Sequence, residues 1–223
     1  MIDTAAVLDE LERNTYRGEQ MSFEQLALMP VRRSGPARSG RQPAVASAKS
    51  SSVSTSVTGR HQDIRLYLTV MIKAFVEMTD AGLVRDAPFE VHSPDGQVYQ
   101  PDIVFIANSN FDRVHETYLE GPPDVAVEVV SVETTAADRG DKFVAYEAMG
   151  VREYWLIDPV REMVNLYHLG PDERYDEFQP DTAGRLRSRV LKGFILDPSQ
   201  LWRRVLPTVA EAVEMAQSML SHR

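Results

Sequence analysis

The segment that most constrains the fold is VAVEVVS (residues 125–131), where apolar residues surround a single glutamate, Glu128. A short continuous run of β-branched residues is typical of a strand that is buried on both faces of a sheet. An isolated carboxylate is costly to bury, so Glu128 requires a cationic partner or a bound metal ion. Taken alone, the residue fits a structural ion pair and a functional site equally well.

An amphipathic helix is predicted for residues 61–79. Its apolar residues recur at intervals of three and four, at Ile64, Leu68, Met71, Phe75 and Met78. This spacing places them on one face of a helix. Gly82 follows where a helix is expected to end. The folded core is therefore expected to begin near residue 61.

A β-hairpin is predicted next. Residues 88–92 are half apolar, Ser-Pro-Asp-Gly is a typical turn sequence, and residues 98–107 (VYQPDIVFIA) are strongly strand-like. Pro101 has no N–H to donate within a sheet, so regular pairing is expected only from Ile103 onward. This places Asp102 at the start of the second strand.

The remaining predicted elements alternate between helix and strand. The first is a helix capped by Thr134 or Thr135 that runs to about Met149, before Gly150. Strands at 153–158 and 163–169 follow, with a further hairpin from 175–178 and 185–190. The last is a C-terminal helix at 208–220, which has Val209, Val213, Ala216 and Leu220 on one side. This order predicts a mixed α/β or α+β single domain.

Composition divides the chain into four parts. We expect an N-terminal helical segment at 1–33, a flexible Ser- and Ala-rich basic linker at 34–59, a folded domain at 60–206 and a C-terminal helix at 207–223. The linker has too little apolar surface to offset the entropy that it would lose on ordering.

The chain has no cysteine and a net charge of −9. It therefore forms no disulfide and no thiolate metal site, and no apolar run approaches the ~20 residues that cross a bilayer. A cytoplasmic protein without a membrane partner is expected. The negative charge disfavours nucleic acid only weakly, because an acidic metal site contributes to it. Zinc-protease, serine-hydrolase and phosphate-loop motifs are absent.

Asp102 and Glu128 are the candidate metal ligands. If their strands are neighbours, the two carboxylates lie side by side at one edge of the sheet. Hard cations such as Mg²⁺, or Mn²⁺ in its place, bind oxygen ligands and retain several waters. Two carboxylates and the backbone carbonyl of Val129 would therefore suffice. For Asp102 alone, an ordinary turn role after a proline is the alternative.

Lys142 belongs to the helix that follows the Glu128 strand, and it can reach back over the end of that strand. A lysine beside a metal ion and a phosphodiester can position the attacking water and offset developing charge. The alternative is a surface ion pair with Asp138, four residues earlier on the same helix.

Four motifs follow one another along the chain: PD, EVxS, DxxxK with a tyrosine four residues later, and GVxEYWxxD. They lie in QPDIVFI and in GPPDVAVEVVSVETTAADRGDKFVAYEAMGVREYWLIDPVREMVNLYHL. Together they resemble the Uma-two family of predicted restriction endonucleases, which belongs to the PD-(D/E)xK nuclease superfamily. The resemblance covers about residues 59–206 and reaches the segment KGFILDPSQLW.

The resemblance implies a restriction-endonuclease-like α/β core, with a central mixed β-sheet flanked by helices and a site at one edge. Matched residue by residue, Asp102 is the acid of the PD motif, Glu128 is the acid of the next motif, and Lys142 is the lysine. The superfamily usually has this lysine two residues after the second acid, where this chain has Val130.

Two accessory residues are suggested by the same resemblance. Glu77 could be an additional helix acid, although an exposed helix face explains it better. Tyr146, one helical turn after Lys142, is expected to pack or to steady the lysine rather than to react.

The leading expectation is a Mg²⁺-dependent DNA endonuclease. A homodimer is expected as well, because two antiparallel DNA strands suit a two-fold pair of sites. The alternative is a nuclease-fold module that binds DNA or protein and regulates without cutting. The acidic charge favours this alternative somewhat, whereas the presence of Asp102, Glu128 and Lys142 counts against it.

Overall fold

The computed structural model describes residues 58–130 and 140–221. Three expectations lie outside these residues: the helical segment at 1–33, all of the 34–59 linker except its last two residues, and the Thr134 or Thr135 cap. Asp138, the alternative partner of Lys142, also lies outside them. Among the described helices, none has the length and apolarity to cross a bilayer.

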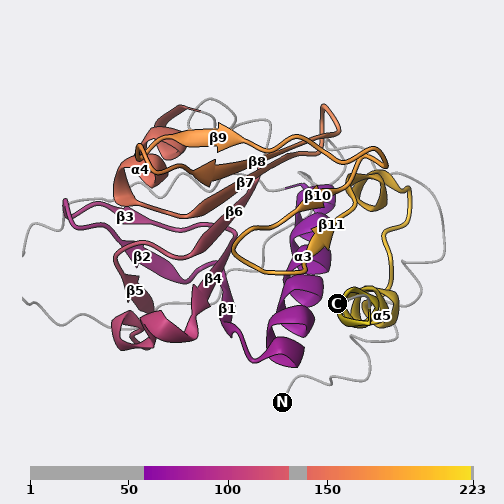
Figure 1. The fold of residues 1–223 in the computed structure, drawn as a ribbon, viewed down its shortest axis with the longest axis horizontal. Coiled ribbons are helices and arrows are strands. Elements are labelled where there is room, and N and C mark those ends of the chain that lie inside the picture. The colour runs from indigo at the N-terminus through magenta and orange to yellow at the C-terminus, as the bar shows by residue number, and fades with distance from the viewer. Residues whose placement is uncertain (1–57, 131–139, 222–223) are drawn as a thin grey trace, which may run out of the picture. The chain divides into compact units, whose positions relative to one another are not determined.

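A six-stranded mixed sheet forms the centre of the described fold (Figure 1). In sheet order its strands are β1 (Gly82–Asp86), β4 (Ile103–Ala107), β6 (Val125–Val129), β7 (Glu153–Asp158), β8 (Met163–Leu169) and β9 (Tyr175–Glu177). Strands β6 and β7 run parallel, and all other neighbours in this sheet are antiparallel. The predicted central mixed sheet is confirmed, and the Glu128 strand lies in its interior.

Two smaller sheets and two 3-10 helices surround this centre. One sheet has three strands, β2 (Glu90–His92), β3 (Val98–Tyr99) and β5 (Tyr118–Glu120). The other has two, β10 (Leu186–Arg187) and β11 (Ile195–Leu196). The 3-10 helices are η1 (Asn108–Arg113) and η3 (Pro198–Trp202). The sequence patterns do not predict β1 or β5. The hairpin predicted from 175–178 and 185–190 is wrong, because β9 pairs with β8 whereas β10 pairs with β11.

Helix α3 (Gly59–Thr79) lies against one face of the main sheet. Thr58 caps its start by accepting a hydrogen bond from the His61 N–H. The predicted apolar stripe is buried except at Met78, which is 38% exposed. The helix ends at Thr79, and Asp80 caps it with a left-handed backbone, φ 49°.

Gly82 is therefore not the helix stop that the pattern predicts. It begins β1 and pairs with Ala107 of β4. A Cβ atom on Gly82 would lie 2.1 Å from the carbonyl oxygen of Ile106. Glycine is needed here because the two strand backbones approach each other closely.

Helix α5 (Val209–Leu220) packs on α3 (Figure 1). Thr208 and Glu211 form a capping box at its start. Ala212 and Ala216 provide its buried face, since small side chains let two helices approach closely. Val209, which the pattern places on the buried side, is 61% exposed.

The two faces of β6 belong to different hydrophobic cores. The odd-numbered valines of the strand pack with α3, whereas Ala126 and Val130 pack with Tyr146 of α4 (Lys142–Met149). Because side chains alternate along a strand, Glu128 points to the α4 side. The strand period thus decides which helix can reach the buried glutamate.

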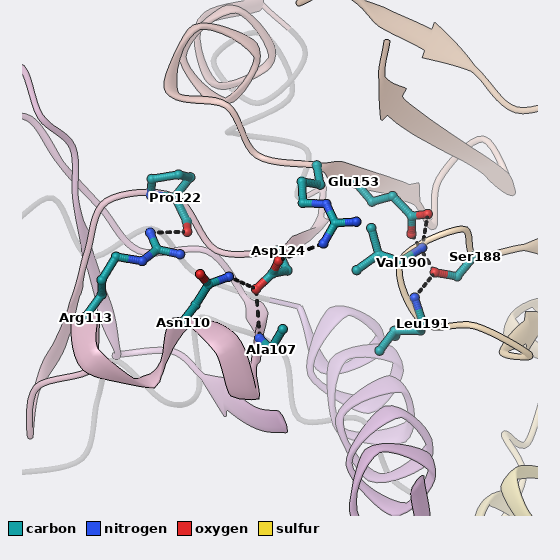
Figure 2. Close-up of polar contacts among 10 residues, drawn as sticks. Ala107, Asn110, Arg113, Pro122, Asp124, Glu153, Ser188, Val190 and Leu191 are labelled. Carbon is teal, nitrogen blue, oxygen red and sulfur yellow. Dashed lines mark hydrogen bonds and ion pairs between the residues drawn. The ribbon is translucent and has the colours of Figure 1, made fainter. Parts of the chain in front are cut away.

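Two other buried carboxylates stand where β6 and β7 begin, at the end of these strands opposite Glu128 (Figure 2). One is Asp124, which accepts hydrogen bonds from the Ala107 N–H (2.7 Å), the Asn110 amide (2.8 Å) and the Arg152 guanidinium (3.1 Å). These bonds join β4, η1 and the residue before β7 to the start of β6.

Glu153 is the second of these carboxylates, and it is fully buried. Its oxygens accept hydrogen bonds from the N–H groups of Arg189 (2.5 Å) and Val190 (2.9 Å), from the Ser188 hydroxyl (2.7 Å) and from the Trp155 indole (3.1 Å). The carboxylate thereby fixes the loop after β10 against the sheet, which is a structural role.

We expect Glu153→Ala to lower the free energy of unfolding by about 3 kcal/mol, because several buried donors lose their acceptor. Urea denaturation followed by tryptophan fluorescence measures this change. Glu214→Ala, on the exposed side of α5, is the control and should stay within about 0.5 kcal/mol of wild type. Equal stability of the two variants would contradict the structural role of Glu153.

Candidate active site

Glu128 is the penultimate residue of β6 and is 2% exposed. Lys142 Nζ lies 2.9 Å from its Oε1 atom, and the Tyr146 hydroxyl donates a 2.9 Å hydrogen bond to the same oxygen. A buried carboxylate is stabilised when a cation and a hydrogen-bond donor face it. The structure therefore brings Lys142 to the Glu128 carboxylate, and the Tyr146 hydroxyl holds the same carboxylate in place.

Helix α4 carries Lys142 and Tyr146, two partners of Glu128. Lys142 and Tyr146 are four positions apart, so they lie on the same face of the helix. Gly150 follows the helix in the left-handed conformation (φ 91°), and its N–H bonds back to the carbonyls of Tyr146 and Glu147. The predicted end of this helix at Met149 is confirmed.

Aromatic packing and one carboxylate hold α4 in place. The Tyr146 ring is fully buried and makes an edge contact with Tyr99, at 5.6 Å between centroids. Glu147 accepts hydrogen bonds from the Tyr175 N–H and the Arg174 guanidinium, both at 2.8 Å. The bond from the Tyr175 backbone is the main reason that the pKa of Glu147 is lowered, so this anchor is ionised at neutral pH.

Asp102 immediately precedes β4. The antiparallel register pairs Ile103 with Val127, so Asp102 stands beside Glu128 at the end of the two strands. Its Oδ2 atom accepts a 2.8 Å hydrogen bond from the Val129 N–H. The two predicted carboxylates thus lie at the same end of neighbouring strands.

Helix α3 approaches Asp102 with two side chains that sequence reasoning missed. His61 Nε2 lies 3.3 Å from Oδ2, and Arg65 Nη1 lies 3.8 Å from Oδ1. His61 is buried, and its Nδ1 atom has no hydrogen-bond partner among the described residues. The two residues are four apart on one helix face, but nothing local in the sequence indicates that this face meets Asp102.

The oxygen atoms at this end of the sheet are of the kind that binds a hard cation. Within residues 58–130 and 140–221, no three His, Asp or Glu side chains are close enough to hold a metal ion together. Two carboxylates, a backbone carbonyl and water are a donor set that Mg²⁺ uses. The N–H and C=O of one strand residue point toward the same neighbouring strand, so the Val129 carbonyl faces the side of Asp102, as its N–H does.

Glu77 lies apart from this group. It is exposed near the end of α3 and forms an ion pair with Lys73, at 2.5 Å. At 1.5 Å of rise per residue it lies about 18 Å along the helix from Arg65. The structure therefore does not bring Glu77 to the two carboxylates, and the exposed-face interpretation explains it.

Comparisons with known proteins place the chain in a family. The sequence profile of the Uma2 family, described as "Putative restriction endonuclease", matches residues 52–199. The crystal structure of a putative nuclease belonging to DUF820 from Anabaena variabilis ATCC 29413 has a similar fold. Its TM-score is 0.55 at 18% sequence identity, over 66% of this chain and 82% of that chain. No curated protein matches. Since the profile spans more than half of the sequence, this chain belongs to the Uma2 family of putative restriction endonucleases.

Proposed function

We propose that this protein is a Mg²⁺-dependent endonuclease that hydrolyses phosphodiester bonds of DNA in the cytoplasm. The proposal is supported by the position of Asp102 and Glu128 at the same end of the neighbouring strands β4 and β6, with Lys142 Nζ 2.9 Å from Glu128 Oε1. Membership of a family described as putative restriction endonucleases supports the reaction class.

Asp102, Glu128 and the Val129 carbonyl would hold the metal ion, and Mn²⁺ could replace Mg²⁺. The ion supplies positive charge that stabilises the phosphate in the transition state. The chain already restrains both carboxylates, since the Val129 N–H and His61 contact Asp102 and Tyr146 contacts Glu128. Such restraint keeps ligands in the geometry that binding requires.

Lys142 would position the attacking water. Its side chain is 25% exposed, so it touches the buried Glu128 and also reaches solvent. An ammonium group has three donors, so it can keep one contact with Glu128 while another binds water or a phosphate oxygen. Its charge would offset the negative charge that develops on the phosphate.

We also propose that two copies associate through an apolar hollow between α3 and the start of α5. Leu66, Val205 and Val209 are 61%, 72% and 61% exposed, and they line this hollow of about 390 Å³. Asp63 and Arg204 line it as well. Two copies related by a two-fold axis would pair these opposite charges and would offer one site to each strand of a duplex.

A module that binds without cutting is the second candidate. Lys142 already neutralises Glu128, and Arg65 lies near Asp102, so the carboxylates are compensated without a metal ion. This compensation and the net charge of −9 favour a DNA- or protein-binding role.

We expect the protein to nick or linearise plasmid DNA with Mg²⁺ and to lose this activity in EDTA. Glu128→Gln and Lys142→Ala should each lower the initial rate at least about 100-fold, because a ligand or a charge-stabilising donor is lost. Gel electrophoresis of time courses measures the rates.

Lys73→Ala is the matched control, because Lys73 is an exposed lysine of α3 that pairs with Glu77. It should keep the wild-type rate, and circular dichroism should show that each variant is folded. Equal rates in wild type, Glu128→Gln and Lys142→Ala would refute the proposed site. Duplex binding by wild type without any cleavage would favour the second candidate.

Tyr146→Phe keeps the buried ring but removes the hydroxyl that contacts Glu128. We expect its affinity for Mn²⁺ to fall roughly 10- to 100-fold, because groups that orient metal ligands have effects of this size. Isothermal titration calorimetry measures the affinity. Tyr118→Phe, on β5, removes a hydroxyl elsewhere and should bind Mn²⁺ like wild type. Unchanged affinity in Tyr146→Phe would show that the hydroxyl does not orient Glu128.

We expect sedimentation equilibrium to show a dimer that Val205→Lys converts to a monomer, because a charge would enter the apolar hollow. Val160→Lys, at a similarly exposed valine on the turn after β7, should leave the dimer intact. Arg204→Asp should weaken association, and adding Asp63→Arg should restore it if the two charges pair between copies. A monomeric wild type at all concentrations would disprove this interface.

A further inference from the structure

Arg65 is a second cation at the carboxylate pair, and the proposed roles of Asp102, Glu128 and Lys142 leave it unused. Its side chain is 31% exposed, and its Nη1 atom lies 3.8 Å from Asp102 Oδ1. Within the described part of the chain, Asp102 is its only ion-pair partner and no group accepts a hydrogen bond from it. Arg65 therefore reaches the site with donors that a ligand can use.

A purely structural role does not explain this position. The 3.8 Å separation is longer than a hydrogen bond, and partly exposed ion pairs contribute little to stability. Arg60, earlier on the same helix, shows the contrast, because it donates hydrogen bonds to the backbone carbonyls of Leu201 and Arg203. Arg60 therefore links α3 to η3 and the residue after it, whereas Arg65 forms no ion pair or hydrogen bond with any described residue except the ion pair with Asp102.

The other partners of Asp102 determine which oxygen faces Arg65. The Val129 N–H and His61 Nε2 both contact Oδ2, at 2.8 and 3.3 Å. Oδ1 faces Arg65 and accepts no hydrogen bond from a described residue. A ligand placed beside Oδ1 would therefore meet the Arg65 guanidinium.

Charge and shape identify the ligand as an anion with several oxygens. Arg65 approaches from the α3 side of the sheet and Lys142 from the α4 side, so the two cations flank the two carboxylates. The four charges cancel, and a divalent ion then makes the site positive, which favours an anionic ligand. A planar guanidinium matches a phosphate because it donates two parallel hydrogen bonds.

We propose that Arg65 binds a phosphate group of the nucleic-acid strand at this site, beside the Asp102 carboxylate. This inference rests on the proposed nuclease function and adds the residue that recognises the substrate backbone. A phosphate contact fixes the position of the strand but carries no information on its sequence.

The test measures binding of a fluorescein-labelled DNA duplex by anisotropy, with Ca²⁺ in place of Mg²⁺. Arg65→Ala should weaken binding roughly 10- to 100-fold, as expected for one charged hydrogen-bonded contact. The slope of log affinity against log salt should become shallower by about 0.9, the value for one lost phosphate contact. Arg65→Lys should restore part of the affinity, because lysine keeps the charge but not the planar fork.

Arg187→Ala is the matched control, since Arg187 is an exposed arginine of β10 at 3.9 Å from Asp181. It should leave duplex binding and its salt dependence unchanged. Calorimetric titration with Mn²⁺ separates this inference from the metal site itself. Arg65→Ala should bind Mn²⁺ at least as tightly as wild type, because a competing cation is removed from Asp102, whereas Asp102→Ala should lose Mn²⁺ binding.

Wild-type affinity and salt slope in Arg65→Ala would overturn the phosphate role, even if the wild-type protein cleaves DNA. Failure of the wild-type protein to bind the duplex would overturn it as well. Duplex binding that depends on Arg65, in a wild-type protein that never cleaves, would overturn the cleavage proposal and leave the phosphate role standing.

Discussion

The buried charge of Glu128 is the constraint on which the rest of the structure depends. Its carboxylate stands in an interior strand of the sheet, where an uncompensated charge would oppose folding. Compensation comes from Lys142 and Tyr146, and both require α4 to lie over β6. The position of α4 depends in turn on the packing of the Tyr146 ring and on the bond from Tyr175 to Glu147. Strand, helix and charge are therefore coupled at one end of the sheet.

The two ends of the sheet surround carboxylates with different hydrogen-bond donors and cations. Asp124 and Glu153 receive bonds largely from backbone N–H groups and short side chains (Figure 2), and one further bond to Asp124 comes from the Arg152 guanidinium. Such donors have fixed positions, so they hold the fold. Asp102 also accepts a bond from a backbone N–H, that of Val129, but it and Glu128 each face a long cationic side chain, Arg65 and Lys142, that can turn to another anion without a change in the backbone. The second end is therefore suited to binding and releasing a ligand.

Much of the fold could be predicted because the relevant signals are local. The spacing of apolar residues indicated α3, and the valine-rich run around Glu128 indicated β6. Gly150 correctly marked the end of α4. The prediction at Pro101 was right only in part, because β4 starts at Ile103 but Val98 and Tyr99, before the proline, already pair with β2, and β4 pairs with β1 and β6 rather than with β2. Local signals failed where two segments approach through space. The pattern predicted Gly82 as a helix stop. The structure shows that a side chain there would clash with the carbonyl oxygen of Ile106 on the neighbouring strand β4.

The sequence by itself determined the strand that contains Glu128 and the helix that carries Lys142, and its motifs indicated the family and the position of Asp102. These features could be read from the sequence because periodicity, turn residues and motif order are properties of neighbouring residues. Only the tertiary structure decided that β9 joins β8, that β10 pairs with β11, and that His61 and Arg65 meet Asp102. Strand partners and contacts between charges depend on the free energy of the whole packed arrangement. A short stretch of sequence does not determine this free energy. The contacts of His61 and Arg65 with Asp102 could therefore be found only from the folded structure.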